Sequence, residues 1–188
     1  MTRLLAAFLT ALAVIGGFAI PVYAGPLSQT VSGTATLTPT GTPGIVSVSF
    51  TGQGQDATYG TFSALSTSTD DLTQLPVITI TDILTTEIFS QGDLFAAGSG
   101  TGTASGTGMT SAMYHLVITG GTGIFAGATG EVTADVTLTV TSPTTESITG
   151  TIVGSLRTVA EPEPGPLTLL APAALVLWYR RRRGTAVR

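Results

Sequence analysis

The feature that most constrains this chain is an alternation of apolar and polar side chains that returns in segment after segment of its middle. In EVTADVTLTV, residues 131–140, every second residue from Val132 onward is apolar. The same period of two runs through VSGTATL (31–37) and SITGTIVGSL (147–156). Successive side chains of a β-strand point to opposite faces, so this spacing predicts strands with one buried face.

Further strands are predicted where short apolar segments lie between turn signals. The turn signals are PTGTPG (39–44), TGQGQD (51–56), SQGD (90–93) and TSPT (141–144). The glycine-rich stretch 98–108 fits a flexible loop or a bent strand, and we expect a strand start that runs into a loop. About eight to ten short strands result; the additional candidates are 45–50, 58–64, 77–83, 84–89, 94–99 and 113–119.

Strands with one apolar face must bury that face, and this composition leaves few helices to cover a sheet. We therefore predict an all-β domain over residues 25–158, built as an antiparallel closed barrel of about eight strands. A β-sandwich is the alternative. A stacked solenoid is disfavoured, because no fixed repeat period runs through the domain.

The N-terminus has the form of a secretory signal peptide. Arg3 precedes an apolar region that ends near Ile20, and Val22 and Ala24 suit signal peptidase cleavage between Ala24 and Gly25. Residues 1–24 are therefore expected to engage the Sec translocon and signal peptidase. An uncleaved N-terminal anchor is the alternative.

Charge and cysteine content exclude several classes of function. Segment 25–164 holds eleven acidic residues and a single base, Arg157, so its formal charge is −10. A body of this charge lacks the basic surface that nucleic-acid binders need. The chain has no cysteine, which excludes disulfides, thiol catalysis and zinc–thiolate sites. The domain must be stable through its core and backbone pairing.

A glycine-rich motif, GGTGIFAGATG, occupies residues 120–130. Its glycines allow positive φ angles and a tight hairpin, and Ile124 and Phe125 add apolar mass. A phosphate-binding loop is not expected, because no Lys-Ser/Thr pair follows and the next element is a predicted strand instead of a helix. The hairpin residues singled out are Gly120, Gly121, Gly123, Phe125, Gly127 and Gly130.

This motif, with GDLFAAGSG (92–100) before it, resembles the glycine-rich strand–turn–strand of allene oxide cyclase and dirigent proteins. The likeness runs from Gly92 to about Leu138. It implies an eight-stranded antiparallel barrel around a central apolar cavity. Plant dirigent proteins carry an arginine in the hairpin after the aromatic residue, where this chain has Ala126 and Thr129. The resemblance therefore supports the barrel and does not carry the activity.

No catalytic constellation can be recognised in the sequence. His115 is the single histidine, and it alternates with Val117 on the face opposite Tyr114, Leu116 and Ile118. No GxSxG nucleophile elbow is present. Asp70 and Asp71 lie in a polar segment that we interpret as a solvated turn. We therefore predict no catalytic residue, no metal site and no cofactor.

The C-terminal segment 159–188 resembles the PEP-CTERM sorting signal that bacterial exosortases recognise. Pro162, Glu163 and Pro164 come first, followed by an apolar run of 13 residues from Leu167 to Tyr179. A stop-transfer cluster ends it, formed by Arg180, Arg181, Arg182 and Arg183. The run would span about 20 Å as a helix, against about 30 Å for a bilayer core. A plain anchor without processing is the alternative.

Together these features predict an exported, non-enzymatic protein. The resemblance of the tail implies a Gram-negative host and delivery to the cell surface or extracellular matrix. It also implies a short transmembrane helix, transient inner-membrane anchoring, an exosortase-type transpeptidase as partner, and association with extracellular polysaccharide and biofilm. The alternative function is a barrel that binds a small apolar ligand in its cavity. The third is an allene oxide cyclase-like or dirigent-like enzyme.

Overall fold

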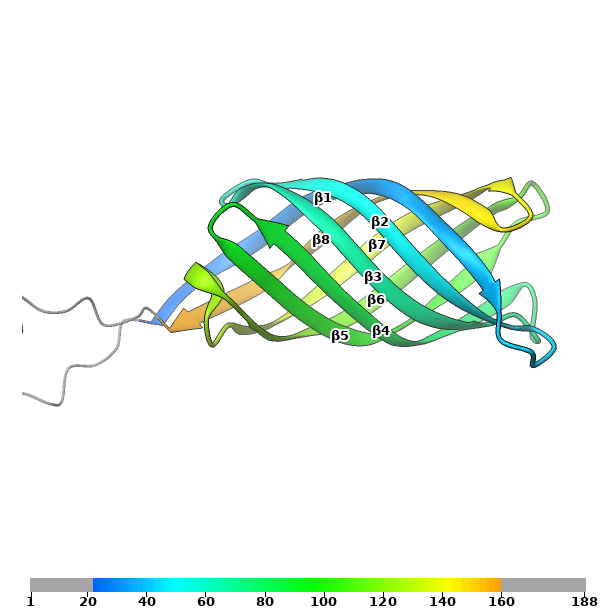
Figure 1. Ribbon diagram of the computed structural model, residues 1–188, viewed down its shortest axis with the longest axis horizontal. Coiled ribbons are helices and arrows are strands. Elements are labelled where there is room, and N and C mark those ends of the chain that lie inside the picture. Colours follow the sequence, from blue (N-terminus) through cyan, green and yellow to red (C-terminus); the bar gives the residue numbers. More distant parts are fainter. Residues whose placement is uncertain (1–21, 160–188) are drawn as a thin grey trace, which may run out of the picture. The chain divides into compact units, whose positions relative to one another are not determined.

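The computed structural model describes residues 22–159, which form a closed barrel of eight antiparallel strands (Figure 1). A short 3-10 helix, η1 (Gly123–Phe125), lies between the sixth and seventh strands. The strands are β1 (Val22–Pro39), β2 (Ile45–Asp56), β3 (Gly60–Asp71), β4 (Val77–Phe89), β5 (Gly92–Ala104), β6 (Met109–Gly121), β7 (Thr129–Ser142) and β8 (Thr145–Val159).

Each strand pairs with its neighbours in the sequence, and β1 pairs with β8 to close the ring. The closing ladder is continuous from Val22↔Val159 to Thr36↔Thr145. The predicted closed barrel is confirmed, and the sandwich alternative is wrong. Closure leaves no free sheet edge in the barrel, which removes the usual site of edge-to-edge aggregation.

The period-two alternation places one set of side chains inside the barrel and the other outside. In β7, Val132, Ala134, Val136 and Leu138 are buried, whereas Val140 at the end of the row is 50% exposed. In β8, Ile148, Ile152 and Leu156 are buried and share their face with two glycines, as the sequence predicted. The outward positions of the same strands are largely Ser and Thr.

The predicted turn at 51–56 is wrong, because these residues continue β2 to Asp56. A Cβ atom built on Gly52 would lie 2.4 Å from the carbonyl oxygen of Ser32 and from the ring of Phe50. One on Gly54 would lie 2.3 Å from the ring of Phe62. The glycines here mark close packing of backbone against aromatic rings, which occurs within strands as well as in turns.

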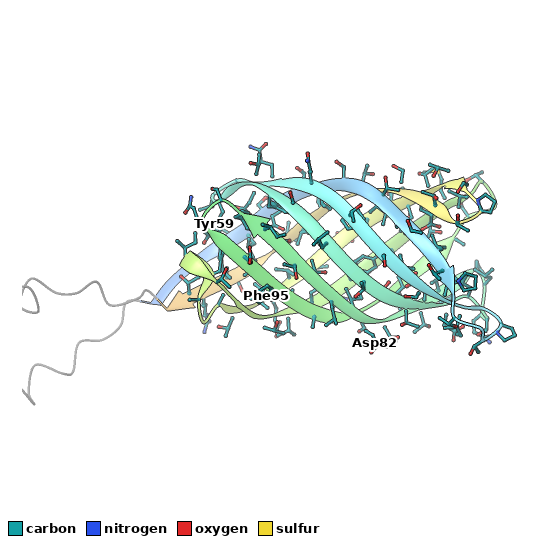
Figure 2. The ribbon with its side chains drawn as sticks, in the orientation of Figure 1. Tyr59, Asp82 and Phe95 are labelled. Atoms are coloured by element: carbon teal, nitrogen blue, oxygen red, sulfur yellow. The ribbon has the colours of Figure 1, made fainter. Side chains whose placement is uncertain are left out.

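One further region differs from the prediction. The candidates 77–83 and 84–89 are one strand, β4, interrupted by a β-bulge between Ile80 and Ile83. Asp82 in this bulge has a φ of +54° and projects from the outer wall (Figure 2). The bulge shifts the inward row by one residue, which explains why the pattern reads as two strands. The stretch 98–108 is strand as far as Ala104 and a loop after it, as predicted.

Within residues 22–159, no helix is long and apolar enough to cross a membrane. The sorting tail predicted beyond Val159, and nearly all of the predicted signal peptide, lie outside the described residues. Ala24 and Gly25 belong to β1, where they pair with Arg157 and Leu156. Cleavage between them would shorten β1 by the three residues Val22 to Ala24.

Candidate functional site: the barrel interior

One end of the interior is closed by aromatic side chains. Phe125 of η1 is fully buried, and its ring centroid lies 5.1 Å from those of both Tyr59 and Phe89. Phe62 lies 4.9 Å from Phe89. Tyr59 is labelled at this end of the barrel in Figure 2. The glycine-rich hairpin thus contributes apolar side chains, as expected, and Phe125 among them closes this end of the barrel.

The local backbone of the hairpin explains how Phe125 reaches the interior. Gly120, Gly123, Gly127 and Gly130 all have positive φ, as the sequence predicted for this motif in general. At Gly123, with φ +56°, a Cβ would lie 2.1 Å from the carbonyl oxygen of Gln91. A side chain there would collide with the β4–β5 turn, so glycine is required for η1 to fold inward.

Asp56, at the same end, is a structural carboxylate. It is 1% exposed, and its Oδ1 accepts hydrogen bonds from the backbone N–H groups of Thr58 (2.7 Å) and Tyr59 (2.9 Å). Its Oδ2 accepts one from the backbone N–H of Ser28 at 3.3 Å. These bonds fix the β2–β3 turn and hold Tyr59 against Phe125.

The middle of the interior is not filled. A cavity of about 80 Å³ lies there, bounded by residues of every strand except β5. This exceeds the roughly 10–15 Å³ that a single water molecule needs. Most of its wall is aliphatic, contributed by β1, β2, β7 and β8; this wall comprises Val31, Val48, Ala134, Val136, Leu138, Ile148 and Ile152.

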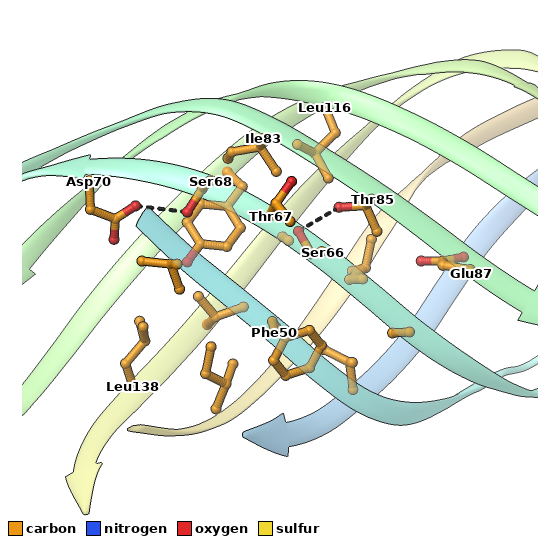
Figure 3. A pocket seen from close by; sticks show the side chains of 18 residues that line it. Phe50, Ser66, Thr67, Ser68, Asp70, Ile83, Thr85, Glu87, Leu116 and Leu138 are labelled. Atoms are coloured by element: carbon orange, nitrogen blue, oxygen red, sulfur yellow. Dashed lines mark hydrogen bonds between the residues drawn. The ribbon is translucent and has the colours of Figure 1, made fainter. Parts of the chain in front are cut away.

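The wall formed by β3 and β4 is polar. Figure 3 shows the hydroxyl groups of Ser66, Ser68 and Thr85 lying between Asp70 and Glu87. Ser68 donates to the Asp70 carboxylate at 2.8 Å, and the hydroxyls of Ser66 and Thr85 are hydrogen-bonded at 3.1 Å. The cavity therefore has one aliphatic side and one side able to form hydrogen bonds.

Glu87 and Gln29 form a buried polar pair deep in the barrel. The side-chain N–H of Gln29 donates to Glu87 Oε2 at 2.9 Å, and the two residues are 3% and 7% exposed, respectively. Gln29 Oε1 is buried without a hydrogen-bond partner. A second cavity of about 10 Å³ adjoins this pair and shares Thr85 and Glu87 with the larger one.

Burial makes these carboxyl groups hard to ionise. Desolvation raises the pKa of Glu87 from 4.5 to about 7, opposed in part by the bond from Gln29 and assisted by the nearby charge of Asp56. Desolvation likewise raises the pKa of Asp70 and of Glu146, the latter with a contribution from Asp70. The pKa of Tyr114 is raised by burial and by both of these carboxylates.

No basic side chain of the described barrel enters the interior. Arg157 and His115 are its two basic candidates, and both are exposed on the outer wall. His115 sits on the face opposite Tyr114 and Leu116, as predicted, beside an open outer hollow near Val117 and Glu131. The interior is consequently acidic, with no positive group to balance Glu87 or Asp70.

The interpretation of Asp70 and Asp71 as a solvated turn is wrong for Asp70. Both residues end β3, and Asp70 lines the cavity. Asp71 takes the turn role, since its Oδ1 accepts the backbone N–H of Thr73 at 2.8 Å. Strand alternation separates the two, because neighbouring residues face opposite sides of the wall.

Sequence reasoning also missed Glu87 and Gln29 as site residues.

Across residues 22–159, no group of three or more His, Asp and Glu side chains is arranged to hold a metal ion.

The fold and interior together define an antiparallel eight-stranded barrel with a small, acidic cavity. A scan against protein-family models found no match, and neither did a search of curated proteins.

Proposed function

We propose that this protein is an exported β-barrel that holds a small, mainly apolar ligand in its interior. The observation that carries this proposal is the cavity of about 80 Å³, with an aliphatic wall facing a row of hydrogen-bonding groups. Binding sites for small molecules combine an apolar lining with a few placed polar groups in this way. An eight-stranded barrel is also wide enough to hold one small ligand.

A purely structural barrel gives no reason for the polar row. Placing a hydroxyl or carboxyl group in an apolar interior costs free energy unless it is hydrogen-bonded. The outer wall has ample room for such groups, yet Ser66, Thr85 and Glu87 face inward. Their presence beside open volume supports a binding role.

A chemical-shift titration of the full-length protein with isobutanol tests the binding proposal. We expect saturable shifts at residues around the cavity, such as Ala134 and Ile152. The matched variant Ala134→Leu, which places three more carbons in the cavity, should abolish them. Binding by the variant as strong as that by the wild type would refute the proposal, as would the absence of saturable interior shifts with both isobutanol and isobutylamine.

Delivery outside the cell is the second part of the proposal, and it is supported by the sequence at the two ends of the chain. We propose removal of residues 1–24 and exosortase-type processing at the tail that begins with Pro162, Glu163 and Pro164. Intact-mass measurement of envelope-associated protein checks this. A species that still ends at Arg188 in a host with an exosortase would contradict it.

An enzyme on this barrel remains a weaker candidate. Glu87, with a pKa of about 7, has the property of a general acid or base at neutral pH. A reaction would also need a group to bind or polarise the reacting atoms, and the neighbouring side chains are hydroxyls and an amide. The arrangement supports binding of a ligand better than it defines a reaction.

A further inference from the structure

Resting on the proposed binding function, we propose that the ligand is a small aliphatic amine. Its ammonium group would lie between the carboxylate of Glu87 and the side-chain carbonyl of Gln29, and its alkyl part would fill the larger cavity. The inference starts from two buried groups that both accept hydrogen bonds and that both border open volume.

The first step is the unpartnered acceptor. Gln29 is 3% exposed and uses its side-chain N–H to bond Glu87, which leaves its Oε1 buried without a donor. Leaving such an atom unpaired is unfavourable, because it has lost its contact with water and gained no donor in exchange. A ligand with hydrogen-bond donors next to Gln29 would recover this cost, whereas a hydrocarbon would not.

The second step is the charge of the site. In the described barrel Asp56, at the end of β2, is the acid whose charge acts on Glu87. Asp70 of β3 lines the same cavity, and Glu146 at the start of β8 interacts with Asp70. Tyr114 of β6 is the remaining titratable group of the cavity wall, and the inward positions of β1, β5 and β7 contribute none. Every one of these groups is neutral or negative, so an anionic ligand is disfavoured.

The third step separates an amine from an alcohol. An ammonium group has three N–H donors, and acceptors lie around it in Glu87, Gln29 and the hydroxyl of Thr85. An alcohol has one donor and can satisfy one of them. Hydrogen bonds between ionised partners are also about twice as strong as neutral ones. The alkyl group would rest on Leu116 and Ile152, which border both cavities.

This arrangement makes binding depend on pH. An alkylamine stays protonated between pH 6 and 8, with a pKa near the value of about 10.4 for lysine. Glu87 loses its proton over the same range, because its pKa is about 7. The binding-competent carboxylate form therefore becomes about tenfold more abundant from pH 6 to pH 8, and the affinity for the amine should rise in proportion.

The test compares isobutylamine with isobutanol, its uncharged analogue of the same size, by chemical-shift titration of the full-length protein at pH 6 and pH 8. We expect the amine to bind about tenfold more tightly at pH 8 than at pH 6, and the alcohol to bind equally at both. Glu87→Gln should remove the pH dependence and the preference for the amine over the alcohol. Glu131→Gln, the same change on the outer wall, should behave as the wild type.

The outcomes distinguish the two proposals. If neither compound binds in the interior, the proposed binding function is wrong. If isobutanol binds but isobutylamine binds no more tightly at pH 8 than at pH 6, the cavity is a binding site and the amine inference is wrong. An amine affinity that rises with pH in Glu87→Gln as it does in the wild type would also overturn the inference, because another group would then carry the charge recognition.

Discussion

The two parts of the barrel interior contrast sharply although they are built from the same eight strands. At the aromatic end, Phe125 is fully buried among the rings of Tyr59 and Phe89. In the middle, Ala, Ser, Thr and Glu occupy some of the inward positions among aliphatic side chains, and a cavity remains. The contrast indicates that the aromatic end stabilises the fold, whereas the middle is less tightly packed and contains groups suited to binding.

Truncation of the aromatic plug should have the largest effect on stability. Phe125→Ala removes a fully buried ring, so we expect the free energy of unfolding to fall by about 3–5 kcal/mol. Its neighbour Ile124 is 44% exposed, and Ile124→Ala should cost less than about 1 kcal/mol. Urea denaturation of both variants measures the difference. Equal losses would show that η1 does not plug the barrel.

Replacement of the buried Glu87 carboxyl group should have the next largest effect on stability. Unlike the loss of Phe125, it should stabilise the protein. The folded protein holds the Glu87 proton more tightly than the unfolded chain does, because the pKa rises from 4.5 to about 7. The contribution of Glu87 to the free energy of unfolding therefore falls as the pH rises from 4.5 to about 7. Over this whole interval the loss is about 3 kcal/mol.

Glu87→Gln should therefore match the wild type near pH 4 and exceed its stability above pH 7. Asp70 and Glu146 have pKa values shifted in the same direction and remain in the variant, so the difference between the two curves isolates Glu87. Denaturation from pH 4 to pH 8 checks this, with Glu131→Gln as the control. A difference that does not change with pH would contradict the raised pKa.

Enlarging a buried alanine should give the smallest difference in stability between the two parts of the interior. Ala128 at the aromatic end is 1% exposed, and Ala128→Leu should cost about 1–3 kcal/mol through overpacking. Ala134 is equally inaccessible at 2% but borders the cavity, so Ala134→Leu should cost less than Ala128→Leu. Thermal and urea unfolding measure both changes. A larger loss for Ala134→Leu would mean that the cavity cannot accept added atoms.

Much of the fold could be predicted from the sequence because alternation reports directly on which face of a strand is buried. The apolar residues alone identify the inward rows of β7 and β8, apart from Val140, which is half exposed at the end of its strand. Errors arose where local chemistry imitated another structure. Gly52 and Gly54 look like turn residues but make room for aromatic rings, and the bulge before Ile83 breaks the alternation in a single strand.

The site was harder to predict, although part of the signal was present. Glu87 shares its parity with Ile83 and Phe89, and Gln29 shares its parity with Leu27 and Val31. A polar residue on an apolar row is the pattern expected of a buried polar site. What the pattern cannot supply is the partner, since Gln29 and Glu87 lie 58 positions apart and meet only across the closed barrel.

The most direct test of the account is the titration of the Glu87 carboxyl group itself. Its ¹³C resonance in the full-length protein, assigned with Glu87→Gln, can be followed against pH with and without isobutylamine. We predict a midpoint near pH 7 for the free protein and a lower midpoint with the amine bound, because the cation stabilises the carboxylate. A midpoint near 4.5 in the free protein, or one that the amine leaves unchanged, would contradict the account.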